Sequence, residues 1–412
     1  MSLFGPYARL FTVPGARAFS LAGAVARLPL STVGLGAVLL VAGETGSYGL
    51  AGAVAGALAL AGAAASPLWA RMMDRRGQAA VLRPAMLAFL GLGLSFVAVV
   101  VADGPRWAWF ALAALTGLAW PNVGAVVRAR WAHALADVGK RQTAFAFESV
   151  IDEVVFVVGP PLVTFLAALV APPAGFLTGQ LVGVAGGLAL ARLSATEPPV
   201  HPRAAGAPRR ATSALSPALL VVAVTYLAVG VVFGGMDVVV VGFAEAEGAP
   251  VVAGVALAVY AGGSLVAGLV YGAVRLPGTL ATRFLGCALF FALAAQALLT
   301  VGSLAVLVPA AFLAGLAIAP VLVSGTSLVE SRVPRAALTE GLAWTMTGLA
   351  LGVTLGAAVA GAAVDAWGAQ AAFVVPAAAA GLAGLLALGG TPLLRGTATP
   401  VVPARVEHPA GG

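Results

Sequence analysis

The chain has 412 residues, of which 61% are hydrophobic and only 9% are charged. A soluble domain has about 25% charged residues, so this composition excludes a soluble globular protein and predicts an integral membrane protein. The net charge of +7 does not indicate nucleic-acid binding, because the basic residues fall in connections between apolar segments. A single cysteine, Cys287, and three histidines in predicted loops or tails exclude a disulfide framework and provide no metal-binding cluster. We therefore expect no cofactor, no metal site and no enzymatic activity.

Twelve segments of the chain are long and apolar enough to cross a bilayer as α-helices. A helix needs about 20 apolar residues to span about 30 Å of hydrocarbon. The alternating ten-residue pattern of a membrane β-barrel does not occur in the sequence. The sequence therefore predicts an all-α membrane protein, with crossings at roughly 18–42, 48–70, 81–102, 107–127, 143–170, 174–191, 217–243, 251–273, 283–301, 304–327, 341–364 and 371–390.

The distribution of basic residues predicts that both termini lie in the cytoplasm. All but two of the 22 Lys and Arg residues fall in the first segment, in alternate connections or in the C-terminal tail. Cytoplasmic connections of membrane proteins are enriched in these residues. The two exceptions are Arg106, on the opposite side, and Arg27, inside the first crossing.

The longest of the predicted cytoplasmic connections, residues 194–216, is rich in proline and arginine and has the character of a linker. We therefore expect an N-terminal six-helix half at 1–193, a C-terminal six-helix half at 217–392 and a cytoplasmic tail at 393–412. The expected location is the bacterial cytoplasmic membrane, with a monomer as the default state.

A motif after the second crossing resembles a known family signature. The chain there contains Ala70-Arg-Met-Met-Asp74-Arg75-Arg76-Gly77-Gln78, which is similar to the loop signature G-x-x-x-D-R-x-G-R/K of the major facilitator superfamily. Ala70 and Gln78 depart from that pattern. An aspartate at this position can accept backbone N–H groups of a neighbouring helix, the two arginines can pair between the halves, and Gly77 allows a tight turn.

Other superfamily motifs are present only in part. The fifth-crossing motif of its antiporters, G-x-x-x-G-P-x-x-G-G, survives as Gly159-Pro160, which we expect to break or hinge that helix. The arginine motif of the fourth crossing, R-x-x-x-G, is missing, because Ala113 stands four residues before Gly117. The run 361–368, Gly-Ala-Ala-Val-Asp-Ala-Trp-Gly, resembles the superfamily's turn between the last two crossings. The resemblance is to bacterial members of the drug/proton-antiporter type, and it implies two six-helix halves that transport a small solute.

Charged residues inside the predicted crossings form the strongest candidate site. Arg27 on the first crossing and Asp152 and Glu153 on the fifth each lie about nine residues from the cytoplasmic end, which is a depth of about 13 Å at 1.5 Å per residue. A carboxylate near the bilayer centre costs about 2.5–3.5 kcal/mol or more. Because arginine stays protonated, one acid would pair with Arg27 and the other could exchange a proton during transport. Glu148 lies one turn earlier, on the same face and nearer the cytoplasmic rim. The alternative is an ion-pair cluster with a purely structural role.

Further polar residues are weaker candidates. Asp237 is the one acid inside the seventh crossing, where it could gate the outer mouth, bind a cation or make a helix contact. A Trp-Pro-Asn sequence at 120–122 should break the fourth crossing. Candidate cavity residues on four crossings, each of which could instead make an interhelical hydrogen bond, are Asn122, Tyr226, Tyr260 and Trp344.

Together these observations predict a secondary transporter. No nucleotide-binding motif G-x-x-x-x-G-K-S/T occurs, so the chain is not expected to hydrolyse ATP. The expected mechanism is alternating access of two halves around a central site. The expected partners are a small-molecule substrate, protons and the bilayer. The favoured function is proton-coupled efflux. The alternatives are a proton symporter or facilitator for a nutrient, and a membrane receptor or assembly factor that does not transport.

Overall fold

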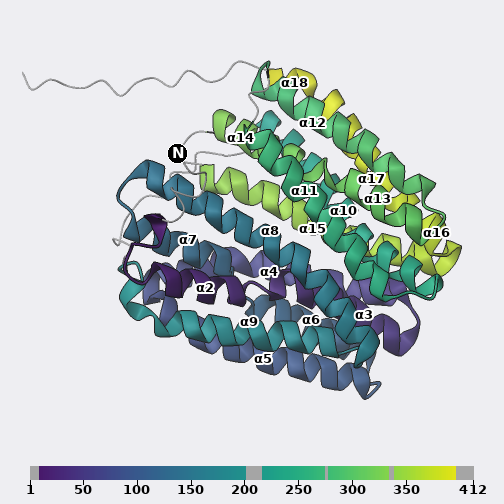
Figure 1. Ribbon diagram of the computed structural model, residues 1–412, viewed down its shortest axis with the longest axis horizontal. Helices are drawn as coiled ribbons and strands as arrows, with labels where there is room; N and C mark the ends of the chain where they lie inside the picture. Colours follow the sequence, from purple (N-terminus) through teal and green to yellow (C-terminus); the bar gives the residue numbers. More distant parts are fainter. Residues whose placement is uncertain (1–8, 201–215, 274–276, 334–337, 396–412) are drawn as a thin grey trace, which may run out of the picture.

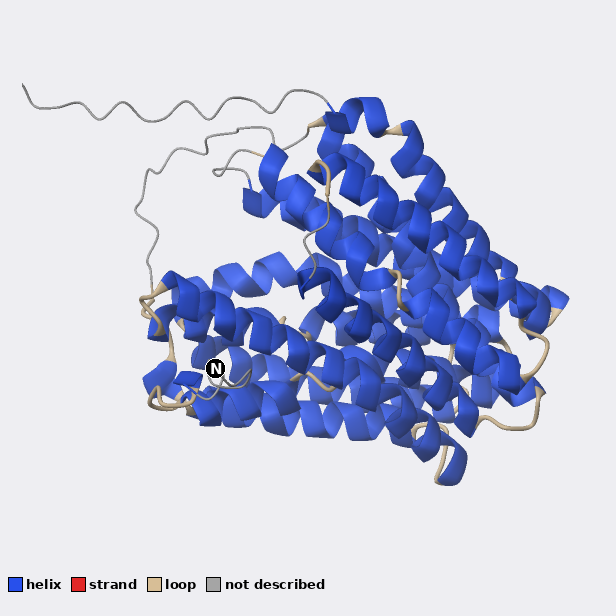
Figure 2. Cartoon of the chain, turned by 45° about the horizontal axis from the view of Figure 1, so that its top comes forward, coloured by secondary structure: helices blue, strands red, loops and turns tan. Residues whose placement is uncertain are grey.

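The computed structural model describes residues 9–200, 216–273, 277–333 and 338–395. Within these ranges all regular secondary structure is helical (Figure 2). Twelve helices or pairs of helices are long and apolar enough to cross a membrane, as the sequence predicts. They pack as two six-helix halves (Figure 1). Within each half, the first crossing lies beside the last.

The crossings of the N-terminal half are built from α2 (Ala16–Ala26) with α3 (Pro29–Thr45), α4 (Tyr48–Arg76), α5 (Gln78–Val101), α6 (Arg106–Ala119) with α7 (Val123–Ala134), α8 (Val138–Leu169) and α9 (Ala174–Arg192), which a short 3-10 turn η1 (Ser194–Thr196) follows. The crossings of the C-terminal half are built from α10 (Pro217–Ala246), α11 (Val251–Ala273), α12 (Leu280–Ala294) with η2 (Ala295–Thr300), α13 (Leu304–Gly315) with α14 (Ile318–Arg332), α15 (Leu338–Trp367), and α16 (Ala369–Ala372) with α17 (Val374–Gly389), before the terminal α18 (Thr391–Arg395).

Two breaks in the N-terminal half position the candidate site. The first crossing is interrupted just before Pro29, which starts α3, because proline lacks the N–H that would continue the hydrogen-bond ladder. The fourth crossing breaks at 120–122 as expected, and the Asn122 side chain accepts a hydrogen bond from Ala125 N (3.0 Å) to start α7. The fourth crossing then continues to Ala134, beyond the predicted end at 127. Its last turns therefore belong to a helix and not to a connection.

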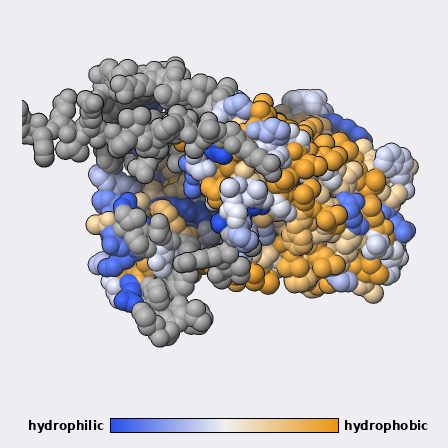
Figure 3. All heavy atoms as spheres, turned by 90° about the horizontal axis from the view of Figure 1, so that it is seen from above, coloured by the Kyte–Doolittle hydropathy of each residue, from blue (hydrophilic) through white to orange (hydrophobic). Residues whose placement is uncertain are grey.

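Hydrophobic residues cover much of one face of the molecule (Figure 3). Figure 3 shows one face on which they cover much of the right-hand part, while hydrophilic residues gather at the left. The left end carries the connections rich in arginine, and we call it the arginine-rich end; the opposite end is the arginine-poor end. An apolar surface of this kind is what the hydrocarbon of a bilayer requires. The cytoplasmic location of the termini stays a prediction, and most of the predicted linker and tail lies outside the described residues.

The two halves pack backbone to backbone toward the arginine-poor end. On α4 and α15, a Cβ added to Gly52 would lie 2.1 Å from the carbonyl oxygen of Ala357. On α11 and α8, a Cβ added to Gly254 would lie 2.0 Å from Thr164 Oγ1. No side chain fits at either glycine without moving the helices apart, so these contacts require glycine.

A carboxylate from the C-terminal half caps a helix of the N-terminal half at the same end. Asp365, in the last turn of α15, accepts hydrogen bonds from Ser47 Oγ (2.8 Å), Tyr48 N (2.9 Å) and Gly49 N (2.8 Å) at the start of α4. A negative charge is favourable at a helix N-terminus. Tyr48 also donates its hydroxyl proton to the carboxylate of Glu245 on α10. These bonds hold the halves together at the arginine-poor end, whereas their ribbons diverge toward the arginine-rich end (Figures 1 and 2).

Candidate functional site

Arg27 lies at the break between α2 and α3 and is buried against α8. Its side chain is 2% exposed, and Nη2 is 2.5 Å from Oε2 of the completely buried Glu148. The second carboxylate oxygen of Glu148 accepts hydrogen bonds from Trp131 Nε1 (2.6 Å) and Ser20 Oγ (3.0 Å). A cation and two donors thus replace the water that this carboxylate would have outside the protein.

Asp152 bridges two arginines one turn further along α8. Arg27 Nη1 lies 3.1 Å from one oxygen, and Arg128 Nη2 on α7 lies 2.8 Å from the other. Asp152 and Arg128 are 25% and 32% exposed, so this part of the cluster contacts water while the Glu148 part does not. Two arginines and two acids make the cluster neutral.

Glu153 is not part of the cluster. It follows Asp152 directly, so its side chain leaves α8 about 100° away. At helical spacing it shares a face with Pro160 and Thr164, and both of these residues pack on Gly254 of α11. Glu153 is partly buried, and within the described residues it has no hydrogen bond or ion pair. The structure therefore places this acid on the side of α8 that faces the C-terminal half.

Close packing of α3 on α8 brings the charged residues together. Ser31 Oγ donates a hydrogen bond to the carbonyl oxygen of Val155 (2.8 Å), and a Cβ on Gly159 would lie 2.0 Å from the same hydroxyl. The helix α8 continues through Pro160 to Leu169, so the expected break at Gly159-Pro160 is wrong as a description of this conformation. In this structure Gly159 allows the close approach that lets Arg27 reach α8.

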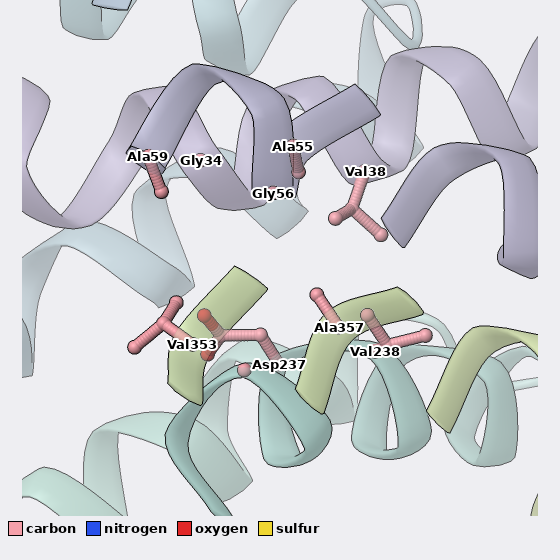
Figure 4. Close-up of a pocket in the computed structure, with 10 residues that line it drawn as sticks. Gly34, Val38, Ala55, Gly56, Ala59, Asp237, Val238, Val353 and Ala357 are labelled. Atoms are coloured by element: carbon pink, nitrogen blue, oxygen red, sulfur yellow. The ribbon is translucent and has the colours of Figure 1, made fainter. Parts of the chain in front are cut away.

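A cavity of about 50 Å³ lies between the two halves (Figure 4). Helices α3, α4, α10 and α15 contribute its walls, and Asp237 on α10 is the only charged residue that lines it. Figure 4 shows the Asp237 carboxylate directed from α10 toward the helices of the N-terminal half. Asp237 is in the opposite half from Arg27, and no ion pair joins the two within the described residues.

The four candidate cavity residues lie in different environments. Tyr226 is fully buried, and its hydroxyl donates to the carbonyl oxygen of Leu322 inside the C-terminal half. Tyr260 is 6% exposed, and its hydroxyl has no partner in the described part of the chain. Trp344 is 47% exposed, near the arginine-rich end of α15. Asn122 caps α7 and lines a second cavity, of about 80 Å³, inside the N-terminal half.

Residues 19–277 match the family model for the Major Facilitator Superfamily. The chain belongs to this superfamily. Its fold is similar to that of the nucleoside transporter NupG (14% identity, TM-score 0.68, covering 93% of this chain and 100% of NupG). It is also similar to a D-xylose–proton symporter (17% identity, TM-score 0.65, covering 95% and 100%).

A third solved structure with this fold is a bacterial homologue of the human lysosomal transporter Spinster, in an inward-facing and occupied conformation. It shares 12% identity and a TM-score of 0.61, over 92% of this chain and 95% of the homologue. A search of curated protein sequences finds no match. The family assignment makes this chain a multi-pass membrane transporter and not an enzyme.

The superfamily loop signature occupies the arginine-rich end of α4. Asp74, Arg75 and Arg76 are exposed, while Gly77 is buried and has a positive φ of 86°. The cap on the following helix comes from elsewhere, because Glu197 accepts a hydrogen bond from Ala79 N (2.6 Å) at the start of α5. Within the described residues Asp74 caps no helix, and its role stays a prediction; Asp365 on α15 caps a helix of the other half at the opposite end of the molecule.

Several residues of the transporter's charge networks are not evident from the sequence. The predicted crossings leave Arg128 and Arg130 in a connection, but both lie on α7, and Arg130 is fully buried. Arg130 donates to Gln78 Oε1 (2.8 Å) and Thr196 Oγ1 (2.6 Å) at the arginine-rich end. Glu148, expected near the rim, is the most deeply buried acid of the cluster. The sequence does contain a sign that the fourth crossing is longer than predicted. Arg128, Arg130 and Trp131 follow its apolar run directly, and a crossing can extend past its last fully apolar turn.

Proposed function

We propose that this transporter exports a small solute in exchange for protons by alternating access between two six-helix halves. The observation that carries the proposal is the position of Glu153, an acid that has no counter-ion among the described residues and faces the other half beside an already neutral cluster. The remnant Gly159-Pro160 of the antiporter motif supports the direction of transport. If the arginine-rich end is cytoplasmic, as the sequence predicts, then the conformation described above faces inward.

The helix opposite Glu153 offers it no positive charge. Helices α8 and α11 run antiparallel, and Thr164 packs on Gly254 near the arginine-poor end. Glu153 lies 11 residues before Thr164 on α8, which is a distance of about 16 Å at 1.5 Å per residue. Because the helices are antiparallel, the residue of α11 that faces Glu153 lies 11 residues after Gly254, near Leu265. The sequence of α11 contains no lysine or arginine.

Closing the arginine-rich end would bring Glu153 against this apolar helix and remove its water. An unneutralised carboxylate at that depth costs about 2.5–3.5 kcal/mol or more. The protonated acid avoids that cost. Without bound solute, closure is therefore favoured when Glu153 carries a proton, so the empty transporter takes a proton with it when it reorients. Exchange then requires that the solute-loaded transporter reorients without this proton. The Arg27 cluster is neutral in either conformation and acts as the fixed part of the N-terminal half.

Transport in proteoliposomes tests the proposal. With an imposed pH gradient, an antiporter accumulates a labelled solute from a panel in the acidic compartment, whereas a symporter accumulates it in the alkaline one. Protein-free liposomes give the passive background. No protein-dependent flux for any solute would instead favour a receptor or assembly factor.

Net solute efflux from loaded proteoliposomes, at equal pH on both sides, tests the role of Glu153, because net efflux needs the empty transporter to return. The wild-type efflux rate should fall as pH rises from 6 to 8, because fewer empty molecules carry the proton that the return step requires. The rate of Glu153→Gln should be independent of pH. Glu247→Gln, the same change at an exposed acid of the arginine-poor end, should behave like the wild type. An equal pH response in Glu153→Gln and the wild type would contradict the proposed coupling.

A further inference from the structure

The cavity between the halves has the properties of a binding site for a positively charged group. Half of its ten lining residues come from α3 and α4 and half from α10 and α15, so a bound group would contact both halves. Apart from Asp237, every lining residue is glycine, alanine or valine. The walls therefore provide neither a counter-ion nor a hydrogen-bond donor from a side chain.

Asp237 has no protein partner in this cavity. Within the described residues it makes no hydrogen bond or ion pair, and it is partly exposed, so its oxygens are open to the cavity. Ionisable groups inside a membrane protein are costly and are normally paired. A carboxylate left open in an apolar cavity of this kind selects a cation.

A second orphan polar group lies next to Asp237. The Tyr260 hydroxyl on α11 is buried without a hydrogen-bond partner in the described chain, and it is close enough to Asp237 to interact with it electrostatically. The Tyr260 ring packs edge-on against Phe233 with centroids 6.2 Å apart, and Phe233 lies one turn before Asp237 on α10.

The size of the cavity limits the group that it can hold. By the same measure a water molecule needs about 10–15 Å³, so a volume of about 50 Å³ accommodates a primary ammonium group but not a bulky quaternary one. A Cβ added to Gly34 would meet nothing within 4 Å, so the wall is open at this position.

We propose that Asp237 binds the ammonium group of the exported solute, which belongs to the class of small primary amines. This inference rests on the function proposed above and specifies its substrate. The Asp237 charge is neutralised either by a proton or by the ammonium group, and the two exclude each other. Mutually exclusive binding of proton and solute at a site that both halves contact is what exchange transport requires.

Binding to the purified full-length protein in detergent tests the inference without any gradient. The probe is benzylamine at pH 7, where it is positively charged, and benzyl alcohol is the neutral control. Benzylamine should raise the melting temperature saturably, and benzyl alcohol should not. Affinity for benzylamine should fall between pH 7 and pH 6, because protons compete for Asp237.

The variants identify the site. Asp237→Asn should weaken benzylamine binding at least tenfold, whereas Tyr260→Phe should have a smaller effect, because its hydroxyl acts on Asp237 from outside the lining of the cavity. Glu247→Gln should bind like the wild type. If Asp237→Asn does not fold, Gly34→Val tests the same site, because it fills the cavity and leaves the carboxylate in place. Its matched control is Gly91→Val on α5, where an added Cβ also meets nothing within 4 Å.

Two results would overturn the inference: no saturable binding of benzylamine to the wild type, or unchanged affinity in both Asp237→Asn and Gly34→Val. The outcome is separable from that of the transport assays. Amine binding without coupled flux would refute the proposed exchange and leave the site standing. Coupled flux without amine binding would refute only the substrate assignment.

Discussion

The buried pair of Arg27 and Glu148 allows a quantitative test of the charge cluster. Replacing Arg27 by glutamine leaves the Glu148 carboxylate in a site that is closed to water. Removing one partner of a buried ion pair typically costs about 3–5 kcal/mol. The hydrogen bonds from Trp131 and Ser20 remain, so we expect the low end of that range, about 3 kcal/mol. At about 2–4 °C per kcal/mol, Arg27→Gln should lower the melting temperature by roughly 6–12 °C.

The double variant provides the control. In Arg27→Gln/Glu148→Gln no charge is left buried, so the loss should be smaller than the sum of the two single losses by about 2 kcal/mol. Asp152 contributes little to the difference, because it keeps Arg128 and is partly exposed. The measurement is the melting temperature of the four proteins in the same detergent, each first shown to be monodisperse. An unchanged melting temperature for Arg27→Gln, or additive losses in the double variant, would refute the reasoning.

Three further predictions concern the closed end and the cluster. Asp365→Ala removes the cap on α4, which costs about 0.5–2 kcal/mol and should let the arginine-poor end open more often. A membrane-impermeant maleimide should then label a cysteine placed at Ala357 about tenfold faster. An unchanged labelling rate would contradict a closing role for the cap. Gly52→Val should abolish transport without preventing membrane insertion, because its side chain would collide with the backbone at Ala357; wild-type flux in this variant would show that the contact is dispensable. Trp131→Phe removes one hydrogen bond to the charged Glu148, and such a bond contributes about 1.5–3 kcal/mol to stability. The melting temperature should fall by about 3–12 °C. A higher melting temperature would show that the bond is not stabilising.

The sequence alone was sufficient to predict the architecture. Segments of about 20 apolar residues have few structural options in a bilayer, because every backbone N–H and C=O must be paired inside the segment. This constraint is local, so the twelve crossings are visible without any knowledge of their packing. The break at 120–122 followed from proline chemistry for the same reason. The pairing of six crossings with six also followed, and the family assignment agrees with it.

The tertiary structure alone decided which charges meet. The sequence placed Arg27 and the acids of α8 at similar depth, but it could not give the rotation of α8 about its axis. That rotation turns Glu148 and Asp152 toward Arg27 and leaves Glu153 facing the other half. Similar depth is a property of position along one helix, whereas a contact depends on two helices and on the small residues between them, such as Gly159 and Ser31.

Capping of α4 by Asp365 illustrates the same division. The sequence indicated that an aspartate of the loop signature could cap a neighbouring helix, and it pointed to Asp74. The role of Asp74 stays a prediction, and the structure shows another cap at the opposite end of the molecule, supplied by Asp365 from more than 300 residues away along the chain. Hydropathy and proline act within one segment and are therefore encoded in its sequence. The partner of a side chain depends on which conformation brings two distant segments within 3 Å, and only the folded structure determines that.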